Sequence, residues 1–198
     1  MTMNNKQRFI WAGLFHMGTN MWNDSIPEEG WEPYVDEYKH LIAAADHLRF
    51  DEKVWRSLTS RMATVGMNMV VIDLGEAIRY PSHPELWVEG SWEIERFRAE
   101  LARLRAMGLE PIPKLNFSAT HDIWLKEYAH MLSTPEYWAC DTNFASTVKY
   151  CRSVCSPEHL KGFLMTTWHF TLPQWEKKNL EAIDQVGAVV ADSAAIRN

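Results

Sequence analysis

Four short apolar runs stand out along the chain, and each ends in polar or turn-forming residues. They cover residues 9–15, 67–73, 109–115 and 162–168. Continuous apolar runs of this length are typical of strands that are buried on both faces of a parallel sheet. Amphipathic stretches follow several of the runs, and strands that alternate with helices indicate parallel βα units. The pattern therefore predicts an α/β protein with about four parallel strands.

The stretch after the first run predicts a helix with well-defined ends. Asp51 is a favourable N-cap residue, and Phe50 and Trp55 are spaced as a hydrophobic staple around it. Apolar residues then recur at helical spacing as far as Gly66. Glycine commonly ends a helix because it adopts the left-handed conformation without a steric penalty, so we expect the helix to end there.

Two further helices are predicted after the second and the last apolar runs. Ser91 is expected to cap the first of these, which then continues to Gly108. The last helix begins near Thr171, and we expect residues 192–198 to fray. The length of 198 residues fits a single domain, in which residues 16–50 form a long loop over the strand ends.

The composition narrows the classes of partner. The formal net charge is −6 and no basic patch is present to neutralise phosphates, so we expect no nucleic-acid partner. No stretch reaches the ~20 apolar residues that a membrane span needs, so we expect no membrane partner either. The cysteines, Cys140, Cys151 and Cys155, cannot all pair within one chain, and reduced thiols indicate a cytoplasmic protein. The ten tryptophans suit a sugar-binding cleft as well as a core.

Polar side chains gather where the apolar runs end. The carboxyl ends of parallel strands share one edge of the sheet, where α/β proteins bind ligands, so these side chains predict a polar site. Asp73, Glu76 and Asp122 are candidates for catalysis, because glycoside hydrolysis uses a pair of carboxylates. The plainer alternative is that Asp73 and Glu76 only cap the following helix. The candidates for substrate binding are His16, Asn20, Trp22, Arg79, Asn116, His121 and Trp168.

The loops at this edge are also expected to form a cleft. Neighbouring parallel strands bring their end loops together. We therefore expect Arg79 and Glu76 to line the cleft, within reach of His121 or Asn116.

Three stretches carry a resemblance to a known family. They are Phe15-His-Met-Gly, the segment Ile112-Pro-Lys-Leu-Asn-Phe-Ser-Ala-Thr-His, and Lys161-Gly-Phe-Leu-Met-Thr-Thr-Trp. Together they resemble the TIM-barrel glycoside hydrolases of the β-N-acetylhexosaminidase type (glycoside hydrolase family 20). The resemblance covers residues 8–132 and 140–190, and implies that His121 corresponds to a histidine that follows the family's third strand. It also implies that Trp168 lines the sugar pocket.

The chain departs from this family at the catalytic pair. The family carries an adjacent Asp-Glu pair after a His-x-Gly motif on its fourth strand, whereas Asp36-Glu37 and Asp51-Glu52 follow no strand. No strand is apparent between Asn116 and Gly162, so the chain resembles a partial TIM barrel that lacks its central strands. The expected function is that of a glycoside-hydrolase-like protein with a carbohydrate cleft, to which hexosaminidase activity does not carry over.

Two other functions stay open. One is a carbohydrate-binding protein without catalysis. The other is a metal-dependent barrel enzyme that uses His16, His121, Asp122 and His169, since imidazole and carboxylate ligands suit zinc. No His-x-His or His-Glu-x-x-His spacing supports a metal, so we expect no metal and no cofactor.

The order of the strands follows from the barrel resemblance and from two prolines. In a closed barrel the last strand pairs with the first, whereas sequential pairing would put the last strand beside the third. Pro111 and Pro113 lack N–H groups on the same side of the third run, so one edge of that strand cannot form a full ladder. The third run is therefore expected at the edge of the sheet. The predicted order is 109–115, 67–73, 9–15 and 163–168.

An open sheet of this kind leaves side chains of the barrel interior uncovered. We expect Val71, Ile112 and Leu164 to be partly exposed. An exposed apolar patch favours self-association, so the sequence predicts a homodimer that joins two half-barrels.

Overall fold

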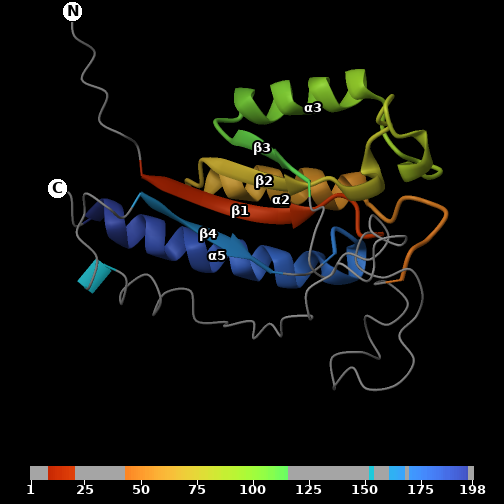
Figure 1. Cartoon of the computed structure of the whole chain (residues 1–198). Coiled ribbons are helices and arrows are strands. Elements are labelled where there is room, and N and C mark those ends of the chain that lie inside the picture. Colours follow the sequence, from red (N-terminus) through yellow and green to blue (C-terminus); the bar gives the residue numbers. More distant parts are fainter. Residues whose placement is uncertain (1–8, 21–42, 116–151, 154–160, 168–169, 196–198) are drawn as a thin grey trace, which may run out of the picture.

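The computed structural model describes residues 9–20, 43–115, 152–153, 161–167 and 170–195. Within these residues the chain forms a four-stranded parallel sheet and three α-helices (Figure 1). The strands are β1 (Ile10–His16), β2 (Met69–Asp73), β3 (Glu110–Lys114) and β4 (Gly162–Thr166). The helices are α2 (Glu52–Thr64), α3 (Ile94–Ala106) and α5 (Pro173–Ala195), with the short 3₁₀ helices η1 (Gly75–Ala77) and η2 (Pro84–Leu86).

The strand order is β3-β2-β1-β4, and every neighbouring pair is parallel, so the predicted α/β fold and strand order are confirmed. The prolines of β3 explain why this strand stands at the edge. The N–H of Glu110 donates to the carbonyl of Asn68 at 2.9 Å, so residue 110 faces β2. The backbone N–H groups of successive residues in a strand point to alternate neighbouring strands. The backbone nitrogens of Pro111 and Pro113 therefore point away from β2. The outer edge of β3 therefore lacks the N–H groups of residues 111 and 113.

All three described helices pack on one face of the sheet. Phe15 of β1 meets Trp55 of α2 edge to face, with ring centres 6.5 Å apart. Helices α2 and α5 lie side by side, and their close approach depends on Gly187, where a Cβ atom would lie 2.6 Å from the Cβ of Val65. No helix of the described residues is long and apolar enough to cross a membrane. The buried cluster between sheet and helices includes Val70, Ile72, Leu58, Met62, Leu104, Ile183 and Val186.

Helix α2 begins and ends as the sequence predicts. The carboxylate of Asp51 accepts the backbone N–H groups of Lys53 and Val54, at 2.8 and 2.9 Å. The Phe50 and Trp55 rings lie 5.9 Å apart and form the expected staple. Beyond the last turn, Gly66 has a φ of +85°, a left-handed conformation that glycine adopts without strain. This helix is therefore set by local sequence signals at both ends.

The predicted N-cap of α3 is wrong. The helix begins at Ile94, its N-cap residue is Glu93, and no side chain caps it. The Ser91 hydroxyl is instead occupied in the preceding loop, where it donates to the carbonyl of Glu76 at 2.7 Å and accepts the N–H of Val88 at 2.9 Å. Near the C-terminal end of the chain, α5 continues to Ala195 and so extends into residues 192–198, where fraying was expected.

The face of the sheet opposite the helices carries the side chains that alternate with the core residues. The strand register aligns Ile112, Val71, Leu14 and Thr166 in one row across all four strands. Ile112 is 40% exposed and Leu164 is 51% exposed, while Val71 is partly buried. The expectation that Val71, Ile112 and Leu164 are partly uncovered is therefore confirmed.

Candidate functional site at the carboxyl edge of the sheet

Three ionisable side chains form a row at the carboxyl edge of the sheet. The register pairs His16 of β1 with Asp73 of β2, and Asp73 with Lys114 of β3. Each is the last residue of its strand and lies two positions after Leu14, Val71 or Ile112 of the row described above. Since side chains alternate along a strand, all three point to the face opposite the helices. We call His16, Asp73 and Lys114 the strand-end row.

Asp73 is the centre of the strand-end row. Its Oδ2 atom accepts a hydrogen bond from Nζ of Lys114 at 3.1 Å and lies 3.3 Å from Nδ1 of His16. The side chains of His16 and Asp73 are 1% and 3% exposed, whereas Lys114 is 33% exposed. Lys114 is thus the member of the row that is most exposed to solvent.

The neighbours of Asp73 decide its charge. Burial by itself raises the pKa of a carboxyl group, because it disfavours the charged form. At Asp73 the His16 imidazole and the Lys114 ammonium outweigh burial and hold the pKa of the carboxyl below its usual value. The strand-end row therefore keeps an ionised, buried carboxylate at neutral pH.

Glu76 also lies at this edge, but its carboxylate is bound within the fold. Its Oε1 and Oε2 atoms accept the backbone N–H groups of Thr19 and Asn20, both at 2.9 Å. The turn that brings this backbone so close requires Gly18, where a Cβ atom would lie 2.5 Å from the Glu76 Oε2 and the Leu74 carbonyl oxygen. Burial raises the pKa of Glu76, and these N–H groups oppose that effect. Glu76 therefore joins the loop after β2 to the loop after β1.

Asn20 is held by the same loop contacts. Its side-chain amide donates to the carbonyl of Ala45 at 2.6 Å, and its Oδ1 accepts the N–H of Ala45 at 3.0 Å. Arg49 donates from Nη2 to Thr19 Oγ1, Asn20 Oδ1 and the carbonyl of Ala43, at 3.2, 3.3 and 2.7 Å. Asn20 is only 4% exposed, so this predicted substrate-binding residue anchors the segment around residues 43–49.

Arg79 stands further out on the loop after β2. Its Nη1 donates to Oε1 of Glu93 at 2.8 Å, and its guanidinium lies over the indole of Trp87, 4.5 Å from the ring centre. Closer to the sheet, Tyr80 donates from its hydroxyl to the carbonyl of Gly75 at 3.0 Å. Burial, with the nearby charges of Glu76 and Asp73, raises the pKa of Tyr80.

The structure brings together part of the predicted site. His16, Asp73, Asn20, Glu76 and Arg79 all lie at the carboxyl edge or on the loops that leave it. Trp22, Asn116, His121, Asp122 and Trp168 lie outside the described residues, so the predicted reach of Arg79 and Glu76 to His121 or Asn116 stays a prediction.

Lys114 is the site residue that the sequence reasoning missed. In the sequence it stands only within the segment Ile112-Pro-Lys-Leu that carries the resemblance. The signal that identifies it is its position: it ends β3 just as His16 and Asp73 end β1 and β2, and the register then puts the three in line.

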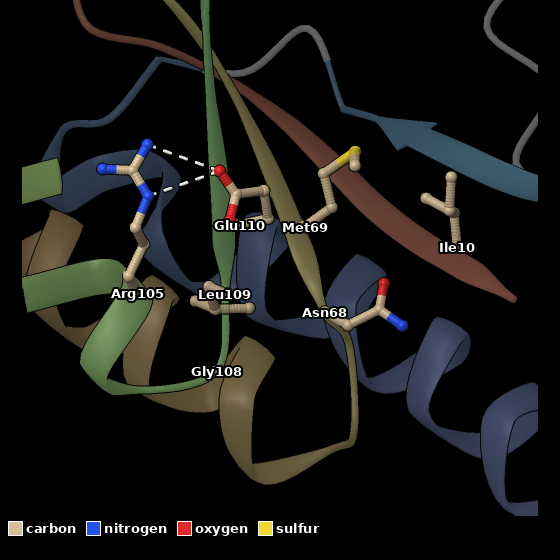
Figure 2. Close-up of a pocket in the computed structure, with 7 residues that line it drawn as sticks. All are labelled: Ile10, Asn68, Met69, Arg105, Gly108, Leu109 and Glu110. Carbon is tan, nitrogen blue, oxygen red and sulfur yellow. Dashed lines mark hydrogen bonds and ion pairs between the residues drawn. The ribbon is translucent and has the colours of Figure 1, made fainter. Parts of the chain in front are cut away.

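A pocket of about 390 Å³ opens at the opposite, amino edge of the sheet (Figure 2). Its polar side chains already have partners. Asn68 accepts the N–H of Trp11 at 3.0 Å and donates to the carbonyl of Phe9 at 2.8 Å, and Arg105 pairs with Glu110 at 3.3 Å. The amino edge of such sheets serves stability more often than chemistry, so the candidate site is the carboxyl edge. The pocket is lined by Ile10, Asn68, Met69, Arg105, Gly108, Leu109 and Glu110.

The metal-dependent alternative gains no support from the part of the chain that the structure describes. No group of three or more histidine, cysteine, aspartate or glutamate side chains is placed there to hold a metal ion. The Asp73 oxygen nearest His16 also accepts the Lys114 ammonium, which competes with a cation at that atom. The residues His121, Asp122 and His169 lie outside the described ranges, so this alternative stays a prediction.

Comparison with known proteins leaves the family open. No protein-family model matches the chain, and no curated protein matches it significantly. The resemblance to glycoside hydrolases therefore rests on the stretches quoted from the sequence.

Proposed function

We propose that the carboxyl edge of this sheet binds a carbohydrate, and that the protein is glycoside-hydrolase-like in origin without the hydrolytic activity of that class. The strand-end row is the observation that carries the proposal. Sugar hydroxyls accept hydrogen bonds, and the row presents the Lys114 ammonium, which the buried Asp73 carboxylate holds, at the sheet edge where α/β proteins bind ligands. Lys114 is part-exposed, so it is the side chain that meets the sugar.

The proposal leaves out hydrolysis because of how the candidate carboxylates are used. A glycosidase needs an acid and a second carboxylate that both reach the glycosidic bond. The carboxylate of Asp73 is 3% exposed and paired with its neighbours in the strand-end row. The carboxylate of Glu76 accepts two backbone N–H groups. Neither is arranged as an open acid or nucleophile, which supports binding without turnover.

The test of binding uses two matched variants, one at each edge of the sheet. Lys114 lies in β3 at the carboxyl edge, and Arg105 lies in α3 at the amino edge. Lys114→Met removes the cation of the strand-end row, and Arg105→Met removes a cation at the amino edge. Saturation-transfer NMR with N-acetylglucosamine and other common monosaccharides measures binding. We expect the wild type and Arg105→Met to bind at least one sugar of the panel, and Lys114→Met to lose that binding. A wild type that binds no sugar, or equal binding by both variants, contradicts the proposal.

Hydrolysis is tested separately with an aryl N-acetylglucosaminide. We expect no release of the chromophore above the rate without protein. Robust turnover that is abolished by Asp73→Asn, Glu76→Gln or Asp122→Asn would show that a carboxylate pair operates and would overturn the non-catalytic part of the proposal.

A further inference from the structure

Trp87 is a large apolar side chain exposed at the carboxyl side of the fold. It is 38% exposed and lies in the loop that joins β2 to α3, just after η2. The other large apolar side chains with comparable exposure among the described residues, Ile112, Leu115 and Leu164, belong to the sheet strands or directly follow one. Trp87 is also absent from the buried cluster between sheet and helices. Trp87 is therefore not a core residue.

The indole of Trp87 is held from one side. The Arg79 guanidinium lies 4.5 Å from the ring centre and also pairs with Glu93 at 2.8 Å. The backbone of Arg79 is fixed as well, because its N–H donates to the carbonyl of Trp92 at 3.0 Å, and the Trp92 N–H donates to the carbonyl of Ala77 at 2.7 Å. The Trp87 ring thus has the Arg79 guanidinium over it.

Trp87 lies on the same side of the molecule as the strand-end row. In Figure 1 the loop between β2 and α3 extends past the arrowhead ends of the strands, which are their carboxyl ends. Arg79 follows Asp73 by six residues, so even a fully extended chain would separate them by no more than about 20 Å. The strand-end row and the start of this loop are therefore no further apart than the length of a short oligosaccharide.

We propose that Trp87 is a stacking subsite for a second sugar unit, so that the ligand is a neutral oligosaccharide that extends from the strand-end row onto the loop after β2. This inference rests on the proposed function. A pyranose ring has an apolar C–H face and polar edges, and an indole offers a flat apolar surface for the first. Arg79, which lies over the ring, and its partner Glu93 have 38% and 62% exposed side chains, and supply donors and acceptors for the hydroxyls of the sugar. Because this pair carries no net charge, it favours a neutral sugar over an acidic one.

The test measures how affinity depends on chain length. N-acetylglucosamine and its β1,4-linked dimer, trimer and tetramer are titrated into ¹⁵N-labelled protein, and the indole N–H signal of Trp87 is assigned with Trp87→Phe. The wild type is expected to bind the oligomers more tightly than the monomer and to shift the Trp87 signal only with the oligomers. Trp87→Ala is expected to weaken oligomer binding about tenfold, the usual size of an aromatic contact, and to leave monomer binding unchanged. Trp87→Phe should restore most of that loss.

Control variants separate the subsite from the strand-end row. Arg79→Met should weaken oligomer binding less than Trp87→Ala, whereas Arg56→Met, which removes an exposed arginine of α2 that pairs with Glu52, should change nothing. Lys114→Met should weaken monomer and oligomers alike. If the wild type binds the monomer but gains nothing from longer chains, or if Trp87→Ala retains that gain, the subsite is overturned and the proposed function stands. If the wild type binds no member of the series, the proposed function fails and the subsite fails with it.

Discussion

The two edges of this sheet use charge in opposite ways. At the carboxyl edge, Asp73 is buried between His16 and Lys114, with 3% of its side chain exposed. At the amino edge, Arg105 and Glu110 form an ion pair in which each side chain is 52% exposed. Ion pairs between exposed side chains contribute little to stability, because water solvates and screens both charges. Burying a carboxylate costs free energy unless its partners stay in place, so the carboxyl edge is the one where geometry is enforced.

Enforced geometry at the carboxyl edge extends from the strand-end row to the loops. Glu76 fixes the backbone after β1, and Arg49 and Asn20 tie that backbone to residues 43–49. Buried ionisable groups with shifted pKa values cluster at functional sites, although structural networks also produce them. The buried charges of the carboxyl edge can thus serve binding or stability, and measurements of both properties distinguish the two roles.

The largest effect is expected at Glu76. Glu76→Ala leaves the buried N–H groups of Thr19 and Asn20 without their acceptor. Each unpaired buried donor costs about 1–3 kcal/mol, so we expect a loss of about 3 kcal/mol in the free energy of unfolding, measured by urea denaturation. Glu110→Ala, the matched carboxylate at the amino edge, should leave stability almost unchanged. Equal effects at the two glutamates would remove the distinction between the edges.

The second prediction concerns Asp73 and pH. A carboxyl group whose folded pKa is lowered contributes stability that is fully present above its unfolded pKa of about 3.9, and loses it as the pH falls through the folded value. Asp73→Asn should therefore cost about 2 kcal/mol at pH 7, the typical worth of hydrogen bonds to a charged group. The difference between wild type and variant should shrink as the pH falls below about 4.

Urea denaturation of both proteins across this pH range checks the prediction. Burial raises the pKa of Glu76, so Glu76 shifts stability in the opposite direction, but it is present in both proteins and cancels in the comparison. A difference that stays constant from pH 7 to pH 3 would mean that Asp73 is not held ionised by its neighbours.

The sequence predicted the fold well and the site only in part, for a physical reason. Periodicity and end signals such as Asp51 and Gly66 are local, so the order of the elements and both ends of α2 could be predicted from neighbouring residues. The role of Glu76 depends on Thr19, 57 positions away, and no local pattern reports that contact. The error at Ser91 has the same origin, because its hydroxyl is taken by the Glu76 carbonyl, 15 positions away, instead of capping α3. Lys114 joined the site only when the strand register was known.

The third prediction concerns the face of the sheet that no described helix covers. If two copies associate through it, Ile112 and Leu164, 40% and 51% exposed, become buried in the interface. Partial burial of such a side chain stabilises association by about 1 kcal/mol in each copy. We expect sedimentation velocity to show a concentration-dependent dimer that Ile112→Ser with Leu164→Ser weakens, and that Arg98→Ser on α3 leaves intact. A wild type that stays monomeric at high concentration contradicts the dimer.

The smallest effect is expected at the amino edge, and it sharpens the comparison because the variants are matched in chemistry. Arg105→Met and Lys114→Met each remove a cation from a carboxylate partner, but Glu110 is solvated whereas Asp73 is buried. Glu110 keeps its hydration when its partner is lost, so Arg105→Met should change the free energy of unfolding by no more than about 0.5 kcal/mol, and less at high salt. Lys114→Met leaves an ionised carboxylate in a dry environment and should cost clearly more, with a raised pKa at Asp73 as the accompanying sign. If the two variants lower the free energy of unfolding equally, Lys114 contributes no more than an exposed surface residue. The strand-end row would then be no different from an ordinary exposed ion pair.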